Sequence, residues 1–564
     1  MPNSTSILLR SVFLYWSQQT PFHRHFPIYR SKQQALLRLL SGLLTIMATT
    51  GLLGFLSLIF QDLRHWAVWL CLFFVLFKVI KLYVKWRELN RAFSPFPGPK
   101  RHWLYGNTQE FSGDESYLDT VVQYAEEYPY AYPLWLGNFF GMLTVCHPDY
   151  AKAILSRQDP KDTFTYYFLI PWIGKGLLVL SGQKWYQHRK LLTPAFHYDV
   201  LKPYVKLMSD SVNVMLDKWE RIIPDKNPVE LFEHISLMTL DTILKCAFSS
   251  QSNCQNYGEN DYIKAVYDLS YLVNYRATFL PYHSDIIFHL SPHGFKSRRA
   301  LKIAHQHTDK VIKERKESLK EVEELEKIRQ KRHLDFLDIL LCAKDENGQG
   351  LSDEDLRAEV DTFMFEGHDT TTSGISWTLY CMAKYPEHQE KCREEIREVL
   401  GDRDTVLWED LSKMPYITMC IKESMRLYPP VPEVGRELVQ PITFCDGRSL
   451  PKGSVILLSI YAMNRCSSIW EDPEVFDPLR FSPENTSGRH SHAFVPFSAG
   501  GRNCIGQTFA MNEMKVALAL TLQRFELNLE PGKEPIKTIQ LVLKSLNGIH
   551  LNLKKIDRMQ EKNQ

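Results

Sequence analysis

Three features that often reveal a function are missing from this sequence. None of its eleven cysteines forms a Cys-x-x-Cys pair, and their scattered spacing argues against a disulfide framework or a zinc site. The chain has no glycine-rich fingerprint for a flavin or nicotinamide nucleotide. Its 67 Lys and Arg residues nearly balance its 65 Asp and Glu residues, which gives no indication of nucleic acid or of an acidic partner. Reduced thiols fit a domain that faces the cytosol.

The hydrophobic runs of the chain are concentrated near its N-terminus. Leu39–Phe60 is 22 residues without a charge and is long enough to cross a bilayer, whereas Trp66–Phe77 is long enough only with its flanks. The length and position of these runs argue against a cleaved signal peptide, although the second run also fits a helix on the membrane surface. Basic residues follow, and by the positive-inside rule they place the rest of the chain in the cytoplasm: Lys78, Lys81, Lys85, Arg87 and Arg91.

These runs divide the chain into three predicted parts. Residues 47–94 form a membrane anchor, and residues 95–564 form one large domain. Residues 1–46 are mixed polar, aromatic and basic, and we treat them as an extension. We hypothesise that translation can start at Met47, which the intact mass of the native protein would test.

The large domain begins with a segment that is unable to form helix. Pro95–Lys100 contains three prolines and a glycine and predicts a stiff connection. Helical periodicity dominates from there on, so we expect a mainly α fold with small β-sheets (α+β). The apolar run Ser454–Met463 predicts a strand, and residues 541–553 predict a hairpin that turns at Asn547-Gly548. Lys310–Arg332 predicts a solvated helix with i,i+4 ion pairs that leads into a flexible loop.

One cysteine lies in a setting suited to metal binding. Cys504 follows Phe497, Gly500 and Arg502 in a glycine-rich loop, and Gly506 and an apolar helical stretch come directly after it. Glycines let a tight loop present N–H groups to a sulfur, and the N-terminus of the following helix favours a thiolate. The arginine could hold a cofactor carboxylate. The alternative is a buried cysteine in a turn, the usual fate of a lone cysteine.

A second segment, Ala358–Ala383, breaks the rules of ordinary packing. Taken as a helix, it aligns Phe363, Glu366, Thr370 and Gly374 on one stripe. A carboxylate, a glycine and successive threonines are poor choices for a core face, and such exceptions indicate a functional site. We expect a kinked helix whose hydroxyl and carboxylate face a cofactor. The alternative is a buried Ser/Thr-rich helix whose hydroxyls bond to its own backbone.

Together these segments resemble the cytochrome P-450 enzymes. The loop matches their haem-binding signature, Phe-x-x-Gly-x-Arg-x-Cys-x-Gly, and residues 367–371 match their distal-helix motif, Gly-x-Asp-Thr-Thr. The resemblance implies that Cys504 ligates haem iron, that Thr370 binds the bound oxygen and that Asp369 helps to relay protons. Glu366, four residues before Thr370, is typical of the family-four fatty-acid hydroxylases, where a glutamate here forms an ester with a haem methyl.

Further matches to the family concern residues around the haem. Glu423 and Arg426 have the Glu-x-x-Arg spacing, and Arg480 supplies the third member of a structural triad. Such i,i+3 pairs are common on helices, so the spacing alone is weak. Trp185 and Arg189 match the pattern Trp-x-x-x-Arg, in which the arginine of the family contacts a haem propionate, and Arg436 lies ten residues after Arg426, where the family often places another propionate ligand. The propionate partners expected from the resemblance are Trp185, Arg189 and Arg436.

The resemblance implies a haem monooxygenase that hydroxylates fatty acids, chiefly at the terminal carbon, in the endoplasmic reticulum membrane. Its electrons would come from NADPH through a flavoprotein reductase, with cytochrome b5 as a further candidate partner, and no nucleic acid is expected. The alternatives within the family are xenobiotic and eicosanoid substrates. A reductase-independent haem-thiolate isomerase or dehydratase and a non-catalytic haem sensor or store are further alternatives, although neither needs the Asp369-Thr370 pair.

Overall fold

The computed structural model describes residues 27–110, 115–138, 140–223, 227–250, 254–255, 261–321, 334–342 and 350–556. Within the first helix, the side chains of residues 27–34, 37, 44, 47–50 and 52–64 are not described. The chain divides into two compact units, Met1–Lys85 and Trp86–Gln564, which we treat separately. Residues 1–26 of the predicted extension lie outside the described residues.

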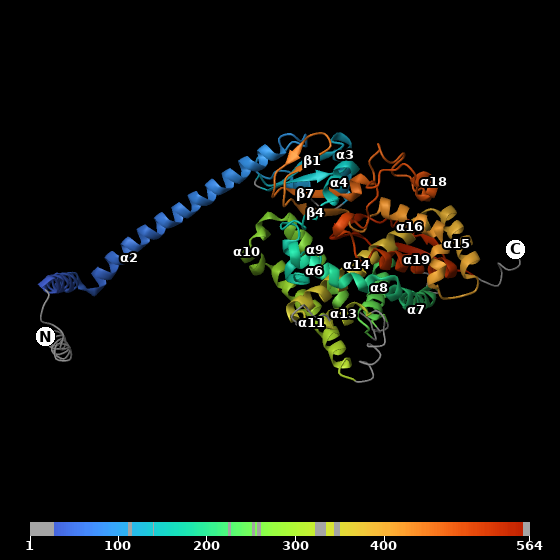
Figure 1. Ribbon diagram of the computed structural model, residues 1–564, viewed down its shortest axis with the longest axis horizontal. Coiled ribbons are helices and arrows are strands. Elements are labelled where there is room, and N and C mark those ends of the chain that lie inside the picture. The colour runs from blue at the N-terminus through green and yellow to red at the C-terminus, as the bar shows by residue number, and fades with distance from the viewer. Residues whose placement is uncertain are drawn as a thin grey trace. The chain divides into compact units, whose positions relative to one another are not determined.

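Helices make up most of the second unit, which confirms the predicted mainly α fold. Figure 1 shows α8, α14 and α19 near the centre of this unit. The α-helices are Pro27–Phe93 (α2), Glu115–Glu127 (α3), Pro148–Leu155 (α4), Ile170–Ile173 (α5), Gly182–Leu192 (α6), Tyr198–Ile222 (α7), Leu231–Ala247 (α8), Asp261–Thr278 (α9), Asp285–Leu290 (α10), Pro292–Ser318 (α11), Phe336–Cys342 (α13), Asp353–Lys384 (α14), Pro386–Leu400 (α15), Pro415–Leu427 (α16), Ile460–Met463 (α17), Pro483–Thr486 (α18) and Gln507–Arg524 (α19).

The strands form four small sheets. The largest has the order β1-β2-β7-β4, in which only the β2/β7 pair is parallel, and a three-stranded sheet has the order β3-β11-β8. The remaining strands form the antiparallel pairs β9/β10 and β5/β6. The bounds are Ala131–Leu136 (β1), Phe140–Val145 (β2), Val229–Glu230 (β3), Glu433–Glu437 (β4), Ile442–Thr443 (β5), Ser449–Leu450 (β6), Val455–Ser459 (β7), Phe525–Leu529 (β8), Lys537–Gln540 (β9), Val542–Ser545 (β10) and His550–Lys555 (β11).

The long helix α14 forms the centre of the core. Its N-terminus is capped by the Ser352 hydroxyl, which accepts a hydrogen bond from the backbone N–H of Asp355 at 3.1 Å, and three acidic residues in its first turn favour the helix dipole. It packs against α8, α16 and α19 and is buried on nearly every side. The predicted interruption of α14 is not seen, since the helix is α-helical over its whole length. The hydroxyls of Thr370, Thr371 and Thr372 donate to carbonyls four residues earlier.

One stretch of α2 has the composition of a membrane span. Among the described residues, His65–Phe93 is long and apolar enough to cross a bilayer, so the second predicted run qualifies together with its flanks. Most of the first run, Leu39–Phe60, lies outside the residues whose side chains are described. Gly51 has a positive φ of 69° and interrupts the helical geometry of α2.

The proline-rich segment that follows α2 is non-helical, as predicted. Phe96 is buried, where its ring meets that of Phe444 edge-on at 6.1 Å. A side-chain carbon on Gly98 would lie 2.6 Å from Cδ of Pro133 in β1. The segment is therefore packed onto the large sheet, and the glycine is required by this close approach.

One predicted strand is shorter than expected, and the predicted hairpin was wrong. The run Ser454–Met463 forms β7 only as far as Ser459, whose hydroxyl then accepts a hydrogen bond from the Ala462 N–H and starts the short helix α17. The turn at Asn547-Gly548 does not join a hairpin, because β10 pairs with β9 whereas β11 pairs with β3 and β8. An apolar run of this length does not distinguish a strand from a strand followed by a helical turn, and turn residues do not determine which strands pair.

The triad and the ion-paired helical part of the charged segment were predicted correctly, whereas the predicted loop after it is not tested. Lys310–Glu314 and Lys313–Glu317 are exposed i,i+4 ion pairs on α11, whereas residues 322–333 lie outside the described residues.

Arg426 binds both carboxylate oxygens of Glu423 at 2.7 and 2.8 Å, and both side chains are fully buried. Arg480 lies 3.4 Å from Glu423. Arg426 also donates to carbonyls of residues 464, 473 and 475, so this ion pair connects α16 to the chain before the cysteine loop.

We expect the replacement Arg426→Met to destabilise the protein strongly, because it leaves the Glu423 carboxylate buried without its main partner. The expected loss in unfolding free energy is about 3–5 kcal/mol. Arg524→Met is the matched control, since its partner Asp217 is half exposed and such pairs contribute below about 1 kcal/mol. Chemical denaturation measures both, and equal losses would contradict the structural role of the triad.

Candidate functional site

The cysteine loop has the geometry that a thiolate ligand needs. The backbone N–H of Cys504 donates to the Phe497 carbonyl at 2.9 Å, which closes the loop, and Gly506 supplies a backbone hydrogen bond to the thiol at the N-terminus of α19. Gly500 has φ 71°, and a side-chain carbon there would lie 1.9 Å from the Leu155 carbonyl oxygen. Only glycine fits at that position.

The Cys504 thiol is accessible although it lies deep in the protein. Burial raises its pKa to about 11, and the nearby Glu366 carboxylate contributes in the same direction, whereas the Gly506 N–H and the cations of Arg189 and Lys161 oppose the shift. Without a further positive charge the sulfur therefore stays protonated at neutral pH. A metal cation bound to the sulfur would supply that charge and hold it as a thiolate.

The central part of α14 approaches this thiol. Within the fully described stretch 358–383, only Glu366, Gly367 and Thr370 are partly accessible, and every other residue is buried. The Thr370 hydroxyl donates to the Glu366 backbone carbonyl at 2.7 Å. Burial raises the pKa of the Glu366 carboxyl to about 7, with Lys161 acting against the shift. Glu366 and Thr370 thus lie on one face, as predicted.

Glu366 differs from the other acids in the middle of α14. Its carboxylate has no hydrogen bond or ion pair to any residue that the structure describes, whereas the neighbouring acids of the helix are each held by another element. These acids and their partners are Glu359 with His188 of α6 (2.6 Å), Asp361 with Thr308 of α11 (2.5 Å) and Asp369 with Lys544 of β10 (2.9 Å). The Glu366 carboxyl is therefore available to a bound group.

Asp369 does not share the accessible face with Thr370. Its side chain is fully buried, and its carboxylate is directed to Lys544 rather than towards Thr370. The two adjacent residues point about 100° apart around the helix. The sequence motif thus brings Asp369 and Thr370 next to each other in the chain without placing both side chains in the same environment.

Several cations converge on the same region. Arg436 is buried, and among the described residues its guanidinium donates hydrogen bonds to the Gly435 carbonyl and to the Ser498 hydroxyl, the latter at 3.4 Å. Arg502 is also buried and donates to backbone carbonyls of residues 178 and 180. Burial, together with the nearby charge of Arg436, lowers the pKa of Arg502 to about 10. No carboxylate among the described residues forms an ion pair with either guanidinium, so both can bind an anionic ligand.

The predicted pair on α6 lies beside the cysteine loop. Arg189 donates to the backbone and side-chain oxygens of Asn503, both at 2.8 Å, immediately before Cys504. The ring of Trp185 lies 4.6 Å from the guanidinium carbon of Arg502. The structure therefore brings Trp185, Arg189 and Arg502 together, although they are contributed by segments more than 300 residues apart in the chain.

Sequence reasoning missed two lysines. Lys161 lies near Arg436, Glu366 and Arg502, and burial and the two arginines hold the pKa of its ammonium group well below the usual value. Lys544 is the partner of Asp369. No local pattern marks either lysine, because each acquires its neighbours only from the fold.

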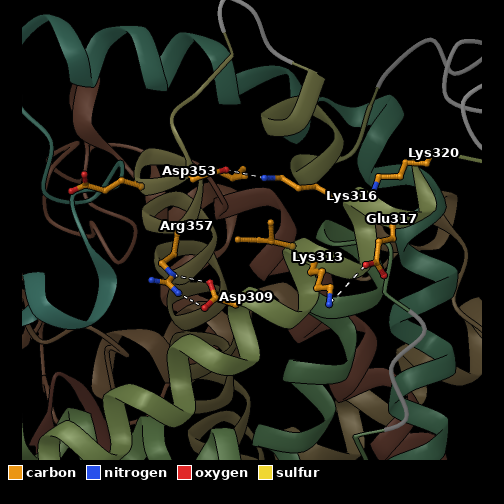
Figure 2. Close-up of a pocket in the computed structure, with 10 residues that line it drawn as sticks. Asp309, Lys313, Lys316, Glu317, Lys320, Asp353 and Arg357 are labelled. Atoms are coloured by element: carbon orange, nitrogen blue, oxygen red, sulfur yellow. Dashed lines mark hydrogen bonds and ion pairs between the residues drawn. The ribbon is translucent and has the colours of Figure 1, made fainter.

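A separate pocket lies away from these residues. It has a volume of about 670 Å³ and lies between α11 and the start of α14, and Figure 2 shows ion pairs among most of its labelled charged side chains, whereas Lys320 has no marked partner. Arg357 binds Asp309, and Lys316 binds Asp353 at 2.9 Å. None of the predicted site residues lines it, and its paired charges leave little for a ligand to bind.

The residues of the site fit haem. Haem carries two carboxylates, for which Arg436, Arg502 and Lys161 offer buried positive charge, and an iron cation, for which Cys504 offers sulfur. A mainly helical protein with an accessible thiol at the start of a helix and a threonine on the facing helix is a haem-thiolate protein.

Comparison with known proteins identifies the family. A family model described as Cytochrome P450 matches residues 96–552. Cytochrome P450 4B1 of Rattus norvegicus is 57% identical over 502 residues (89% of this chain, 98% of the relative), and that of Homo sapiens is 56% identical over 501 residues (89% and 98%). Cytochrome P450 4A6 of Oryctolagus cuniculus is 55% identical over 518 residues (92% and 97%). The chain belongs to the cytochrome P450 family, in its family-four branch.

Membership of the family confirms several predictions made from the sequence. The protein is an enzyme, a monooxygenase, and its cofactor is haem iron. It receives electrons from a redox partner.

We expect Cys504→Ser to abolish the thiolate signature, because a serine hydroxyl does not ionise to replace the sulfur ligand. The measurement is the position of the Soret band of the reduced, carbon monoxide-bound protein. Cys466→Ser, at a partly buried cysteine outside the loop, is the control and should leave the band unchanged. A normal thiolate band in the Cys504 variant would disprove the assignment of the ligand.

Proposed function

We propose that this enzyme hydroxylates fatty acids at the terminal carbon. The observation that carries the proposal is the Glu366 carboxyl, which has no described partner, lies one turn before Thr370 and is close enough to Cys504 to influence the pKa of its thiol. The C–H bonds inside a fatty-acid chain are weaker than those of its terminal methyl group. Selective attack on the methyl group therefore requires the site to admit the chain end-on and to hold it there. A rigidly held cofactor serves that selectivity.

Glu366 is proposed to form an ester with the haem. The carboxyl group is accessible and has no hydrogen bond to another described residue, so it can react without breaking an existing interaction. When bound, the haem supplies the oxidation of an unactivated C–H bond, which no side chain can perform. The propionates are assigned to Trp185, Arg189, Arg436 and Arg502.

Thr370 and Asp369 are proposed to deliver protons. The Thr370 hydroxyl is partly accessible on the side of α14 that faces Cys504, and it can pass a proton by exchanging its bond to the Glu366 carbonyl. Asp369 is the adjacent acid. Phe497, Gly500 and Gly506 shape the cysteine loop, so their role is to position the sulfur.

We also propose the redox partners and the cellular location of the protein, on the basis of its family. We assign a NADPH-dependent flavoprotein reductase, with cytochrome b5 as a second candidate, and the endoplasmic reticulum membrane with the catalytic domain on the cytoplasmic side. Residues 1–46, 47–94 and 95–564 remain the proposed extension, anchor and catalytic domain. Exposed apolar side chains of the second unit are compatible with contact with lipid, among them Trp103, Leu104, Ile286, Leu290 and Phe295.

We expect the purified protein, with reductase and NADPH, to convert lauric acid to its terminal hydroxy acid, because the rigid site favours the chain end. Products are resolved by position in mass spectrometry. Inner-chain products alone would contradict the terminal selectivity. No product despite a normal thiolate band would favour xenobiotic or eicosanoid substrates, and turnover of peroxides without NADPH would favour an isomerase.

We expect acidified organic solvent to leave haem attached to the wild-type protein and to extract it fully from Glu366→Gln, because an amide is unable to form the ester. The retained haem is measured by the mass of the denatured chain. Glu433→Gln is the matched control: Glu433 is also buried, burial raises its pKa to about 7, and it binds Tyr117 at 2.8 Å. Complete extraction from the wild-type protein would exclude the ester.

A further inference from the structure

Strand β10 contributes a buried cation to the back of α14. The Lys544 ammonium group lies 2.9 Å from a carboxylate oxygen of Asp369, and the two side chains are only 7% and 0% exposed. Among the described residues neither group has another polar partner. The ring of Tyr267 on α9 lies 4.0 Å from the ammonium nitrogen and closes the other side. The pair is therefore isolated from water and from other charges.

The backbone of β10 fixes this pairing. The Leu543 carbonyl accepts hydrogen bonds from the Ser373 hydroxyl at 2.6 Å and from the Trp377 indole at 3.3 Å, and the Leu543 N–H donates to the Pro430 carbonyl at 2.9 Å. Ser373 lies one turn after Asp369 on α14. Lys544 follows Leu543 directly, so its side chain is held opposite Asp369.

This arrangement has a consequence for proton delivery. While Asp369 is bound to Lys544 it points away from Thr370, and it must leave the lysine before it can reach the threonine hydroxyl. A buried carboxylate that leaves its only partner is strongly destabilised. The strength of the Asp369–Lys544 pair therefore controls how often the Asp369 carboxyl leaves Lys544 for Thr370.

We propose that Lys544 is a positioning residue that controls proton transfer from Asp369 to Thr370. When Asp369 leaves Lys544 it takes a proton from water, donates it to the Thr370 oxygen as the hydroxyl passes its own proton onward, and returns to Lys544 as a carboxylate. One proton enters and one leaves in each cycle. This inference rests on the proposed roles of Asp369 and Thr370.

The first test compares Lys544→Met with Lys544→Arg in the full-length holoenzyme with its reductase. We expect the methionine variant to form less product and more hydrogen peroxide per NADPH, by about threefold or more, because the carboxylate that Asp369 becomes after giving up its proton then has no buried partner and proton donation becomes less favourable. The arginine variant should restore the wild-type ratio. Asp369→Asn combined with Lys544→Met should show the same ratio as Asp369→Asn alone, because Lys544 acts through Asp369. Effects that add, or a methionine variant with the wild-type ratio, would overturn the proposal.

The second test needs no substrate, so it remains informative if lauric acid is not converted. We expect Lys544→Met to shift the infrared C–O stretching band of the reduced, carbon monoxide-bound protein, because the released carboxyl changes the polarity near Thr370. The same shift should be absent from the double variant with Asp369→Asn. An unchanged band in Lys544→Met would overturn the proposal while leaving the fatty-acid assignment intact.

A matched control separates positioning from stability. Arg315→Met removes a comparably buried ion pair, in which Arg315 binds Asp338 at 2.8 Å with side-chain exposures of 6% and 0%. It should lower the thermal stability and leave the peroxide ratio and the C–O band unchanged. If Lys544→Met does not retain haem, Lys544→Gln keeps a hydrogen-bond donor without the charge and is measured in its place, with the same expected shifts.

Discussion

The rest of the structure depends on how the acidic side chains of the buried helix α14 are compensated in the protein interior. A buried charge is tolerated only when a partner compensates it, and three of these acids are each paired with a group from a different element. The partners come from α6, α11 and β10, so the pairs also fix the position of those elements around the helix: Glu359 with His188, Asp361 with Thr308 and Asp369 with Lys544. Glu366 is the exception, and it is the one that faces the cysteine.

The buried cations near the cysteine loop also need partners of opposite charge. Arg436 and Arg502 are buried without a carboxylate partner among the described residues, and Lys161 lies close to both. With the proposed assignment, Arg436, Arg502 and Lys161 would hold the haem propionates, whose negative charge would relieve the mutual repulsion of these cations. Binding of haem therefore compensates charges that the protein itself leaves uncompensated, and it couples cofactor binding to the stability of the fold.

The features that could be predicted from the sequence are those that local geometry determines. The loop around Cys504 needs glycines at fixed positions, and Glu366 and Thr370 share a face because a helix repeats every 3.6 residues. The hairpin at Asn547-Gly548 was wrong because strand pairing depends on edges that distant segments supply. The contacts of Lys161 and Lys544 were missed for the same reason.

Glu366 and Asp369 show how much of the site depends on such distant contacts. They are acids three residues apart on one helix. They differ because β10 supplies Lys544 as an ion-pair partner for Asp369, whereas Glu366 has no partner among the described residues. The register of β10 is fixed by the Leu543 carbonyl, which binds Ser373 of α14. A shift of one residue in that strand would turn Lys544 to the opposite face of the sheet and leave Asp369 as unpaired as Glu366. Strand β10 thus sets the electrostatic surroundings of Asp369. With the role proposed for Asp369, a change in the register of this strand would act on the chemistry without touching a residue of either signature motif.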